Sequence, residues 1–576
     1  MARFAMESLS IQSSLRDRIA PWIEGGLLAL VVMVVVSLGG DAVRTSYHGF
    51  LHTSLGEAVL RDGLMPENPY HAGTPLHYYT LYPTLGVLLG KLGGGPLWGF
   101  AILNIFAAML MGPALDAFGK RLGLGFTARR FAFFSMVLGF NGLAQWWVSA
   151  DTPMVEGASP LLVLLDLTQP MSGLSWDGRL QSFLPKFLNV SSFAISLPFA
   201  FFALADNLAS GKRETLRMGV LLGITMALNP LVGGFVAVLV VLEKLPLLKQ
   251  GVQGIKTLLP AAAVAVLIAL PFLLPLLGGS PEGDTTMAGV FPFIGSGAWA
   301  NLLGPLLLLW PLGIWGVFKL PKDKRPPLCF ALGLAALFSF LSLPWNNEYK
   351  FPRMEGILLA LPVGAALGSL WKTLPGKLIG PVLGLLCVPT FWSTFQAYAQ
   401  WDLGESNLLN HVEDGRLALR PAGLIETWPT KIAAAEQELA ENAVLLLHPW
   451  HPGIRGSAFG AQGNPLMPVL SHALFVDAPQ IHNASLPDLR ERLDASFALW
   501  QGRRWVKQDS KPSDPYAPTQ ALAAIRSKIA GRPLAVVTLK DHPAVQILIA
   551  AGGSLVVEEN ELAMWLIPPL EAPVDN

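Results

Sequence analysis

The feature that most constrains this chain is a series of long apolar runs. The first, residues 22–40, is almost uninterrupted and has about the 20-residue length with which a helix crosses the hydrocarbon core of a bilayer. The chain has 52% hydrophobic and only 14% charged residues, against about 25% charged in soluble proteins, which excludes a wholly soluble protein. Nine further apolar runs follow, over residues 96–118, 131–149, 191–209, 219–242, 258–277, 298–318, 328–343, 356–370 and 381–395.

The charge balance and the cysteines narrow the choice of partners. The 40 Lys and Arg residues equal the 40 Asp and Glu residues, so no basic excess points to nucleic acid. Cys329 and Cys387 both lie within apolar runs, which leaves no disulfide framework and no cysteine metal site. We therefore expect the lipid bilayer as a partner and no nucleic acid.

The residues before the first run set its orientation. Arg3, Arg16 and Arg18 precede it, and the positive-inside rule then places the N-terminus in the cytoplasm and Asp41 outside. A cleaved signal peptide is the competing interpretation. An uncleaved first span is favoured because the segment before the run is long and no clear Ala-x-Ala site follows it.

Four basic clusters between the later runs predict the rest of the topology. All four become cytoplasmic only if residues 219–242 cross twice, as a hairpin broken at Asn229 and Pro230, because proline removes a helix hydrogen bond. We expect about eleven spans in a cytoplasmic (inner) membrane, with the C-terminus outside. The clusters are Lys120, Arg121, Arg129 and Arg130; Lys212, Arg213 and Arg217; Lys244, Lys249 and Lys256; and Lys319, Lys322, Lys324 and Arg325.

The composition changes after the last apolar run. Residues 1–396 are expected to form a membrane domain, and residues 397–576 a soluble extracytoplasmic α/β domain, because polar residues return there. His448 begins a His-Pro-Trp-His-Pro segment after the first expected strand; a rigid turn is favoured there over contact with a glycan. The expected strands are residues 443–447, 534–539, 554–558 and 562–567, and the expected helices are 486–500 and 519–529.

Polar chemistry in the membrane half is concentrated in residues 41–80, which we call the first loop. It holds four of the ten histidines. Asp41, Arg44, His48 and His52 are spaced by three or four residues, which predicts one side of an amphipathic helix at the membrane surface. We expect His52 to face solvent, and a metal bound by His48 and His52 lacks a clear third ligand. A carboxylate at the lip of a span, as at Asp41, is costly unless it has a task or a partner.

The first loop also carries a resemblance. After Asp41 come a Gly-x-x-Pro motif at residues 63–66, Pro-Leu-x-Tyr-Tyr at 75–79 and Tyr-Pro-x-Leu-Gly at 82–86. This order resembles the multi-span glycosyltransferases of the GT-C fold, which use polyprenyl-phosphate-linked sugars. The resemblance covers the membrane half and is strongest over residues 41–122. It implies a mostly α, GT-C-like helix bundle.

The resemblance implies catalytic roles for two acids. Asp41 matches the position of the catalytic base or metal ligand in the first outer loop. Asp151 matches the second acid, although a turn aspartate before Pro153 explains it equally well. The chain has no adjacent pair of acids in the first loop, so the need for a divalent cation is left open, with Asp41, Asp151 and His48 as the residues that would hold it.

The resemblance also implies groups that hold the substrates. Lys350 and Arg353 are the candidates for the donor phosphate, with Lys186 as a weaker third. The alternatives are a snorkelling pair at the lipid headgroups or an ion pair with Glu348 or Glu355, and a merely solvated Lys186. The residues expected to contact substrate are His48, Tyr78, Tyr79 and Glu348.

The function expected on this basis is inverting transfer of a hexose or pentose from a polyprenyl-phosphate donor to a glycan, lipid or protein acceptor. A transporter or flippase is the first alternative, and it requires charged residues lining a path through the bundle. A non-catalytic scaffold for envelope assembly is the second, and it predicts that Asp41→Asn leaves function intact.

Overall fold

The computed structural model describes residues 2–45, 48–93, 95–143, 183–209, 211–248, 251–277, 306, 308–341, 350–399, 430–448, 470–476, 488–504, 515–529 and 531–570. The chain divides into two compact units. The helical unit comprises Met1–Val43, Ala101–Pro271 and Thr286–Gln400. The mixed unit comprises Arg44–Phe100, Phe272–Thr285 and Trp401–Asn576.

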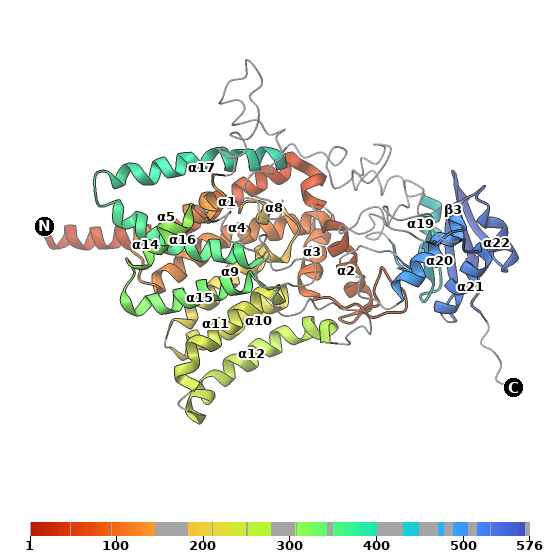
Figure 1. The fold of residues 1–576 in the computed structure, drawn as a ribbon, viewed down its shortest axis with the longest axis horizontal. Helices are drawn as coiled ribbons and strands as arrows, with labels where there is room; N and C mark the ends of the chain where they lie inside the picture. The colour runs from red at the N-terminus through yellow and green to blue at the C-terminus, as the bar shows by residue number, and fades with distance from the viewer. Residues whose placement is uncertain are drawn as a thin grey trace, which may run out of the picture. The chain divides into compact units, whose positions relative to one another are not determined.

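Helices account for the membrane half, and each expected apolar run overlaps at least one of them (Figure 1). The break expected at Asn229 and Pro230 is present, because α10 ends at Leu228 and α11 begins at Pro230. The helices are α1 (Ala2–Thr45), α4 (Pro96–Arg121), α5 (Phe126–Phe134) with a π-turn η1 (Ser135–Gly139), α8 (Pro185–Leu188), α9 (Ser192–Asn207), α10 (Lys212–Leu228), α11 (Pro230–Leu248), α12 (Val252–Leu277), α14 (Leu309–Val317), η3 (Lys322–Lys324), α15 (Arg325–Phe338), α16 (Lys350–Leu370) and α17 (Gly376–Ala399).

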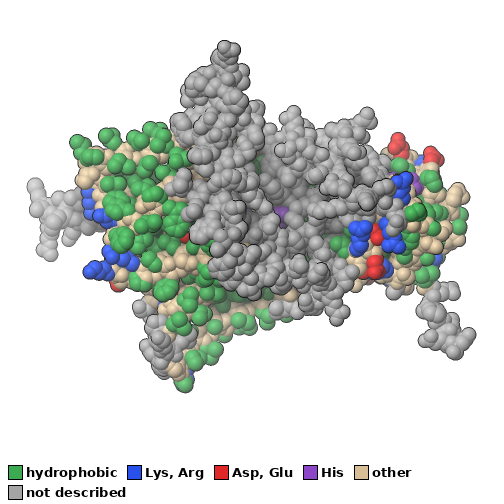
Figure 2. Space-filling view, in the orientation of Figure 1, with side chains coloured by type: hydrophobic (Ala, Val, Ile, Leu, Met, Phe, Trp, Pro, Cys, Tyr) green, Lys and Arg blue, Asp and Glu red, His purple; other side chains and the backbone are tan. Residues whose placement is uncertain are grey.

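Among the described residues, five helices are long and apolar enough to cross a membrane. Figure 2 shows hydrophobic side chains over the visible surface of the helical unit, and α12 and α17 expose large residues such as Leu267 and Leu385. Such an apolar exterior suits lipid. The chain is thus a multi-pass membrane protein, and the total of eleven spans stays a prediction. The five segments are Leu15–Gly40, Trp98–Arg121, Gly254–Leu276, Lys350–Leu370 and Gly376–Gln396.

The prediction of a single amphipathic helix from Asp41 to His52 is wrong. Gly40 has a left-handed φ of 54° inside α1, and α1 ends at Thr45, before α2 (Gly49–Asp62) begins. Glycine tolerates this conformation because it has no Cβ. Asp41 and His52 therefore lie on different helices, and His52 is buried, with 2% of its surface exposed.

The mixed unit contains a five-stranded sheet of order β2-β1-β3-β5-β4. β1 pairs in parallel with β2 and β3, and β5 pairs antiparallel with β3 and β4. The expected strands and helices of the tail are all found; β2, α19 and α22 were not predicted. The elements are β1 (Val444–Leu447), β2 (Ala473–Leu474), β3 (Leu534–Leu539), β4 (Ser554–Glu559), β5 (Leu562–Ile567), α2, α3 (Leu81–Leu92), α19 (Thr430–Gln437), α20 (Leu489–Gln501), α21 (Pro518–Lys528) and α22 (Ala544–Ala550).

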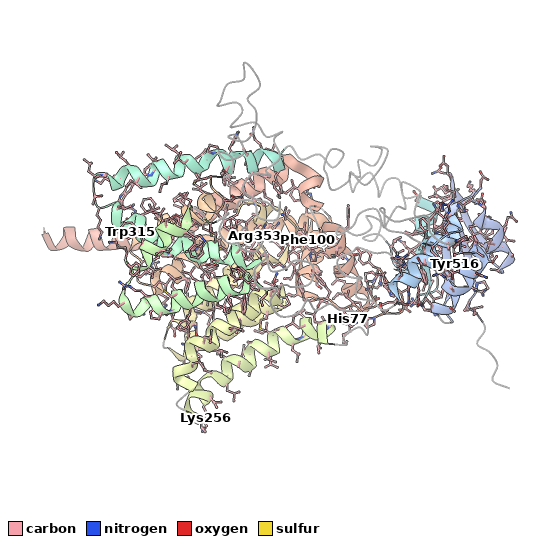
Figure 3. All side chains as sticks on the ribbon, in the orientation of Figure 1. His77, Phe100, Lys256, Trp315, Arg353 and Tyr516 are labelled. Atoms are coloured by element: carbon pink, nitrogen blue, oxygen red, sulfur yellow. The ribbon has the colours of Figure 1, made fainter. Side chains whose placement is uncertain are left out.

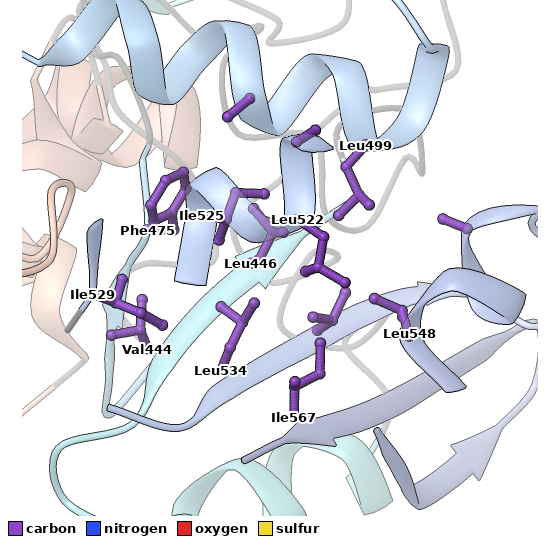
Figure 4. Packing of buried hydrophobic residues seen from close by; sticks show 14 of the residues in the cluster. Val444, Leu446, Phe475, Leu499, Leu522, Ile525, Ile529, Leu534, Leu548 and Ile567 are labelled. Carbon is purple, nitrogen blue, oxygen red and sulfur yellow. The ribbon is translucent and has the colours of Figure 1, made fainter. Parts of the chain in front are cut away.

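Alternate residues of the central strands contribute side chains to two separate hydrophobic cores. On one face, Val444 and Leu446 pack with residues of α20, α21 and α22 (Figure 4). On the other, Leu445 and Leu447 pack with α19 and with the first loop, through residues such as Leu55. Side chains alternate between the faces of a strand, so one short strand serves both cores. The first loop thus covers one face of the C-terminal sheet.

Candidate functional site

The structure distributes the predicted site residues over both units. Lys186, Lys350 and Arg353 belong to the helical unit, and His48, Tyr78 and Tyr79 to the mixed unit. Asp151 and Glu348 lie outside the described residues. Asp41 is placed in the last turns of α1, but its side chain is also outside the described part. The roles of these three acids stay predictions.

One end of the helical unit is built from ion pairs, and we call it the ion-pair end. Arg129 Nε donates to Asp116 Oδ1 at 2.7 Å, and Lys120 Nζ lies 2.8 Å from Asp116 Oδ2. Arg130 contacts Asp116 and lies 3.1 Å from Glu24, while Arg129 also contacts Asp17. These cations belong to a basic cluster found in the sequence, and acids neutralise them here. They are therefore poor candidates for binding a phosphate.

The opposite end, which we call the amide end, joins α4, α8 and α17 through Asn189. Asn104 Nδ2, on α4, donates to the Asn189 carbonyl at 3.0 Å, and the Tyr398 hydroxyl, on α17, donates to Asn189 Oδ1 at 2.9 Å. A Cβ on Gly39 would collide with the Tyr398 carbonyl, so α1 packs tightly against α17 here. Asp41 lies two residues after Gly39 in α1, so its backbone is at the amide end.

The three predicted phosphate ligands belong to elements that meet at the amide end. Lys186 lies in α8, three residues before Asn189, and is only 5% exposed. A Cβ on Gly356 of α16 would collide with the ring of Phe140, and that ring lies 6.1 Å from the ring of Phe183. Phe183 in turn accepts a hydrogen bond from the Lys186 backbone at 3.1 Å. The start of α16, with Lys350 and Arg353, and α8 are therefore linked through Phe140.

Burial decides between the alternatives for these cations. Arg353 is 2% exposed and lies inside the helical unit (Figure 3), so it does not extend along a lipid-facing surface as a snorkelling arginine does. Lys186 is buried, which excludes the solvated interpretation. Glu355 is fully buried as well, and neither of its carboxylate oxygens has a hydrogen-bond partner among the described residues. The alternative ion pair with Glu355 is therefore not formed.

In the mixed unit, the His52 ring lies among aromatic residues of the first loop and of α3. Its ring lies 4.9 Å from Tyr82, 5.7 Å from Tyr78 and 6.0 Å from His48, between ring centroids. Tyr78 and Tyr79 stack at 4.2 Å, and the Tyr78 hydroxyl donates to that of Tyr79 at 3.0 Å. Stacked rings with hydroxyl groups offer surfaces on which a sugar can pack. Sequence reasoning missed His52 because a single histidine at helical spacing carries no sign of burial.

No metal centre is evident in the part of the chain that is described. No group of three His, Cys, Asp or Glu side chains there is placed to hold a metal ion. The side chains of Asp41 and Asp151, the two acids expected beside His48, lie outside that part.

Comparison with solved structures identifies the fold. The chain aligns with the arabinofuranosyltransferase AftD from Mycobacteria with a TM-score of 0.54 and 13% identity, over 95% of this chain. The alignment spans 40% of AftD's length. ArnT from Cupriavidus metallidurans, bound to undecaprenyl phosphate and in the apo state, aligns with TM-scores of 0.48 and 0.46 at 11% and 12% identity, over 96% and 94% of this chain and 98% of ArnT in both cases.

No protein-family model and no curated protein sequence matches the chain. At such low identities a structural likeness establishes the fold and nothing finer. The fold assignment rests on AftD, because the ArnT alignments have the lower TM-scores. The GT-C-like fold expected from the first loop is thus confirmed.

Proposed function

We propose that the chain is an integral membrane glycosyltransferase that moves a hexose or pentose from a polyprenyl-phosphate donor to a glycan, lipid or protein acceptor outside the cytoplasmic membrane, with inversion. The observation that carries this proposal is the burial of Lys186 and Arg353 at the amide end of an apolar helical unit. The fold shared with AftD supports the same class of protein.

Buried cations suit a phosphate leaving group. A charge taken out of water is costly unless an opposite charge compensates it, and it acts more strongly on a ligand in a medium of low dielectric. Lys186, Lys350 and Arg353 would hold the donor phosphate and neutralise the charge that grows on it as the sugar departs. We place the donor at the amide end because Lys186 and Arg353 are buried there.

The reaction we propose is a single displacement. The bond between the anomeric carbon and the phosphate oxygen breaks while the acceptor oxygen bonds to the same carbon from the opposite side, through an oxocarbenium-like state. Asp41 takes the proton of the acceptor hydroxyl, and Asp151 assists as a second acid or as a ligand of a divalent cation. Polyprenyl phosphate leaves, and no covalent glycosyl-enzyme forms.

The aromatic residues of the first loop complete the proposal. His48, Tyr78 and Tyr79, together with Glu348, would contact the sugar and the acceptor. The remaining parts of this proposal are eleven spans and a C-terminal domain that lies outside the cytoplasm and takes part in choosing the acceptor.

The experiment that tests this function is native mass spectrometry of the purified protein with a panel of polyprenyl-phosphate sugars, combined with an assay for released polyprenyl phosphate. Selective binding together with release names the sugar. Asp41→Asn should abolish release while the donor still binds, because the base is needed for proton removal and contributes little to ground-state affinity. If the panel shows no binding and no release, the proposal is contradicted and a transporter or a scaffold is favoured. Normal release by Asp41→Asn would contradict the role of Asp41 as the base.

A further inference from the structure

Four polar or aromatic side chains meet where the central strands of the C-terminal sheet end. His448 follows β1, and its backbone N–H donates to the Val537 carbonyl of β3 at 3.0 Å, which continues the parallel ladder by one residue. Thr538 follows Val537 in β3. Val444, Leu446 and Val536 all face the core under α20, so alternation puts His448 and Thr538 on that same face.

Two further rings contact His448. The ring of Trp500, near the end of α20, lies 4.8 Å from that of His448 and 5.5 Å from that of His542, between centroids. His542 follows β3, and its ring lies 4.8 Å from that of His448. We call these four residues, His448, Trp500, Thr538 and His542, the strand-end cluster.

The place of the cluster in the topology is informative. β1 has β2 on one side and β3 on the other, and all three strands run in parallel, so the strand order reverses beside β1. In open α/β sheets, ligands bind beyond the carboxyl ends of the strands at such a switch point. The strand-end cluster occupies that position between β1 and β3.

The cluster also contains buried polar groups without a hydrogen-bond partner among the described residues. Thr538 is fully buried and Trp500 is 6% exposed, yet neither the Thr538 hydroxyl nor the Trp500 indole N–H has a hydrogen-bond partner among the described residues. Buried polar groups are nearly always hydrogen-bonded, and an unsatisfied one costs stability. Thr538 and Trp500 each neighbour His448, Thr538 by strand pairing and Trp500 by ring contact, so a ligand at this switch point could satisfy both groups.

The chemistry of these groups defines the ligand. His542 Nδ1 accepts a hydrogen bond from the Ala544 N–H at 3.1 Å, so the proton of the neutral ring is on Nε2. Together with the Thr538 hydroxyl and the Trp500 N–H, the cluster therefore offers donors beside aromatic rings. The nearest cation in sequence, Lys540, lies 3.6 Å from Glu558, and burial lowers the pKa of His542, so the cluster carries no evident positive charge.

We propose that the strand-end cluster is a binding site for a neutral sugar ring, which packs on the aromatic side chains and accepts hydrogen bonds from Thr538, Trp500 and His542. This site lies in the C-terminal domain and goes beyond the transfer reaction, which does not require it. Half-buried His542 is the member that a ligand meets first. The domain would in this way hold a glycan by one of its sugar units.

The test is saturation-transfer NMR on the full-length protein in nanodiscs, with neutral methyl pentosides and methyl hexosides as probes and inorganic phosphate as a separate arm. Thr538→Val replaces the hydroxyl with a methyl group of similar shape, and Trp500→Phe removes the N–H. Both should weaken sugar binding about fivefold to tenfold. Thr519→Val, the same substitution on the exposed start of α21, should leave it unchanged.

Stability provides the second readout. Because the Thr538 hydroxyl has no hydrogen-bond partner in the part of the chain that is described, Thr538→Val should leave the thermal midpoint unchanged or raise it. A lower midpoint would show that the protein itself satisfies the hydroxyl and would overturn the proposal. So would sugar binding that is unaffected by both variants, or binding of phosphate in place of sugar. Arg353→Gln, in the helical unit, should weaken donor binding and spare this site, which separates the two proposals.

Discussion

His71 Nε2 lies 3.1 Å from Asp488 Oδ1, so a residue of the first loop is paired with one at the start of α20. Arg492 Nε donates to Asp488 Oδ2 at 2.7 Å, and its Nη1 donates to the Ala72 carbonyl at 2.7 Å. The Ala72 N–H in turn donates to the carbonyl of Leu474 in β2 at 2.8 Å. This polar clamp of His71, Asp488 and Arg492 fixes the first loop to the edge of the C-terminal sheet.

Asp488→Asn should destabilise the mixed unit by about 1.5–3 kcal/mol, because it weakens charge-assisted contacts of a partly buried carboxylate. Burial alone would raise the pKa of Asp488, but the contacts from His71 and Arg492 outweigh it and hold that pKa well below its usual range. Chemical denaturation of the purified protein measures the effect. Asp541→Asn, at an exposed position of the same domain, is the control. Equal stability of the two variants would show that the clamp contributes nothing.

The clamp should also make stability depend on pH. Burial lowers the pKa of His71 despite the neighbouring Asp488, so the folded protein holds this ring neutral. Unfolding then takes up a proton below the ordinary histidine pKa of about 6.5, and stability should fall as the pH drops from about 7 toward 5. Asp488 contributes the same sign at lower pH, because its stabilisation is lost as the pH falls through its depressed pKa. Denaturation midpoints between pH 5 and 8 should decline less steeply for His71→Gln than for the wild type; identical slopes would contradict this.

Arg353→Gln should lower the rate of polyprenyl-phosphate release by about 100-fold, since it removes a buried positive charge from the proposed phosphate site. Release by matched amounts of folded protein measures this. Lys372→Gln is the control, because Lys372 is an exposed cation just beyond the other end of α16. A rate that falls equally in both variants, or in neither, would argue against the assigned site. Arg353→Lys separates charge from the planar geometry of the guanidinium.

The two ends of the helical unit should respond differently to loss of an acid. Asp116→Asn removes the carboxylate that contacts Lys120, Arg129 and Arg130. It should destabilise the protein by about 3 kcal/mol, because the buried Arg129 and Arg130 lose their shared acid and, among the described residues, keep only Asp17 and Glu24. Glu355→Gln should change stability by less than about 1 kcal/mol, since no partner is lost. Thermal unfolding in detergent compares the two. A larger loss for Glu355→Gln would show a partner that the described residues do not include.

Much of the fold follows from local pattern. The apolar run at residues 22–40 lies within α1, the break at Asn229 and Pro230 separates α10 from α11, and β3 and β5 have the bounds that alternation predicts. The elements that were missed are short or lack a distinctive pattern. β2 has only two residues and exists because it pairs with β1, which no local pattern records.

The candidate site, like the fold, could be predicted from the sequence only in part. The resemblance singled out Lys350 and Arg353 from the sequence, but their chain positions did not show that Arg353 would be buried at the end of the unit where Asn189 joins α4 and α17. His52 was expected to face solvent, and it lies instead at the centre of an aromatic cluster. Burial of a polar side chain depends on neighbours that are remote in sequence.

Residue order alone is enough to predict a multi-span membrane protein with a polar α/β tail, because apolar length and strand alternation are properties of neighbouring residues. Which polar groups meet depends on contacts between segments that are distant in the chain. Such contacts pack the first loop onto the C-terminal sheet through His71 and Asp488 and neutralise one basic cluster with Asp116. They also bury Thr538 and Trp500 without a hydrogen-bond partner among the described residues. These contacts join segments that are distant in sequence, and they form only when the hydrophobic cores of the whole chain have packed.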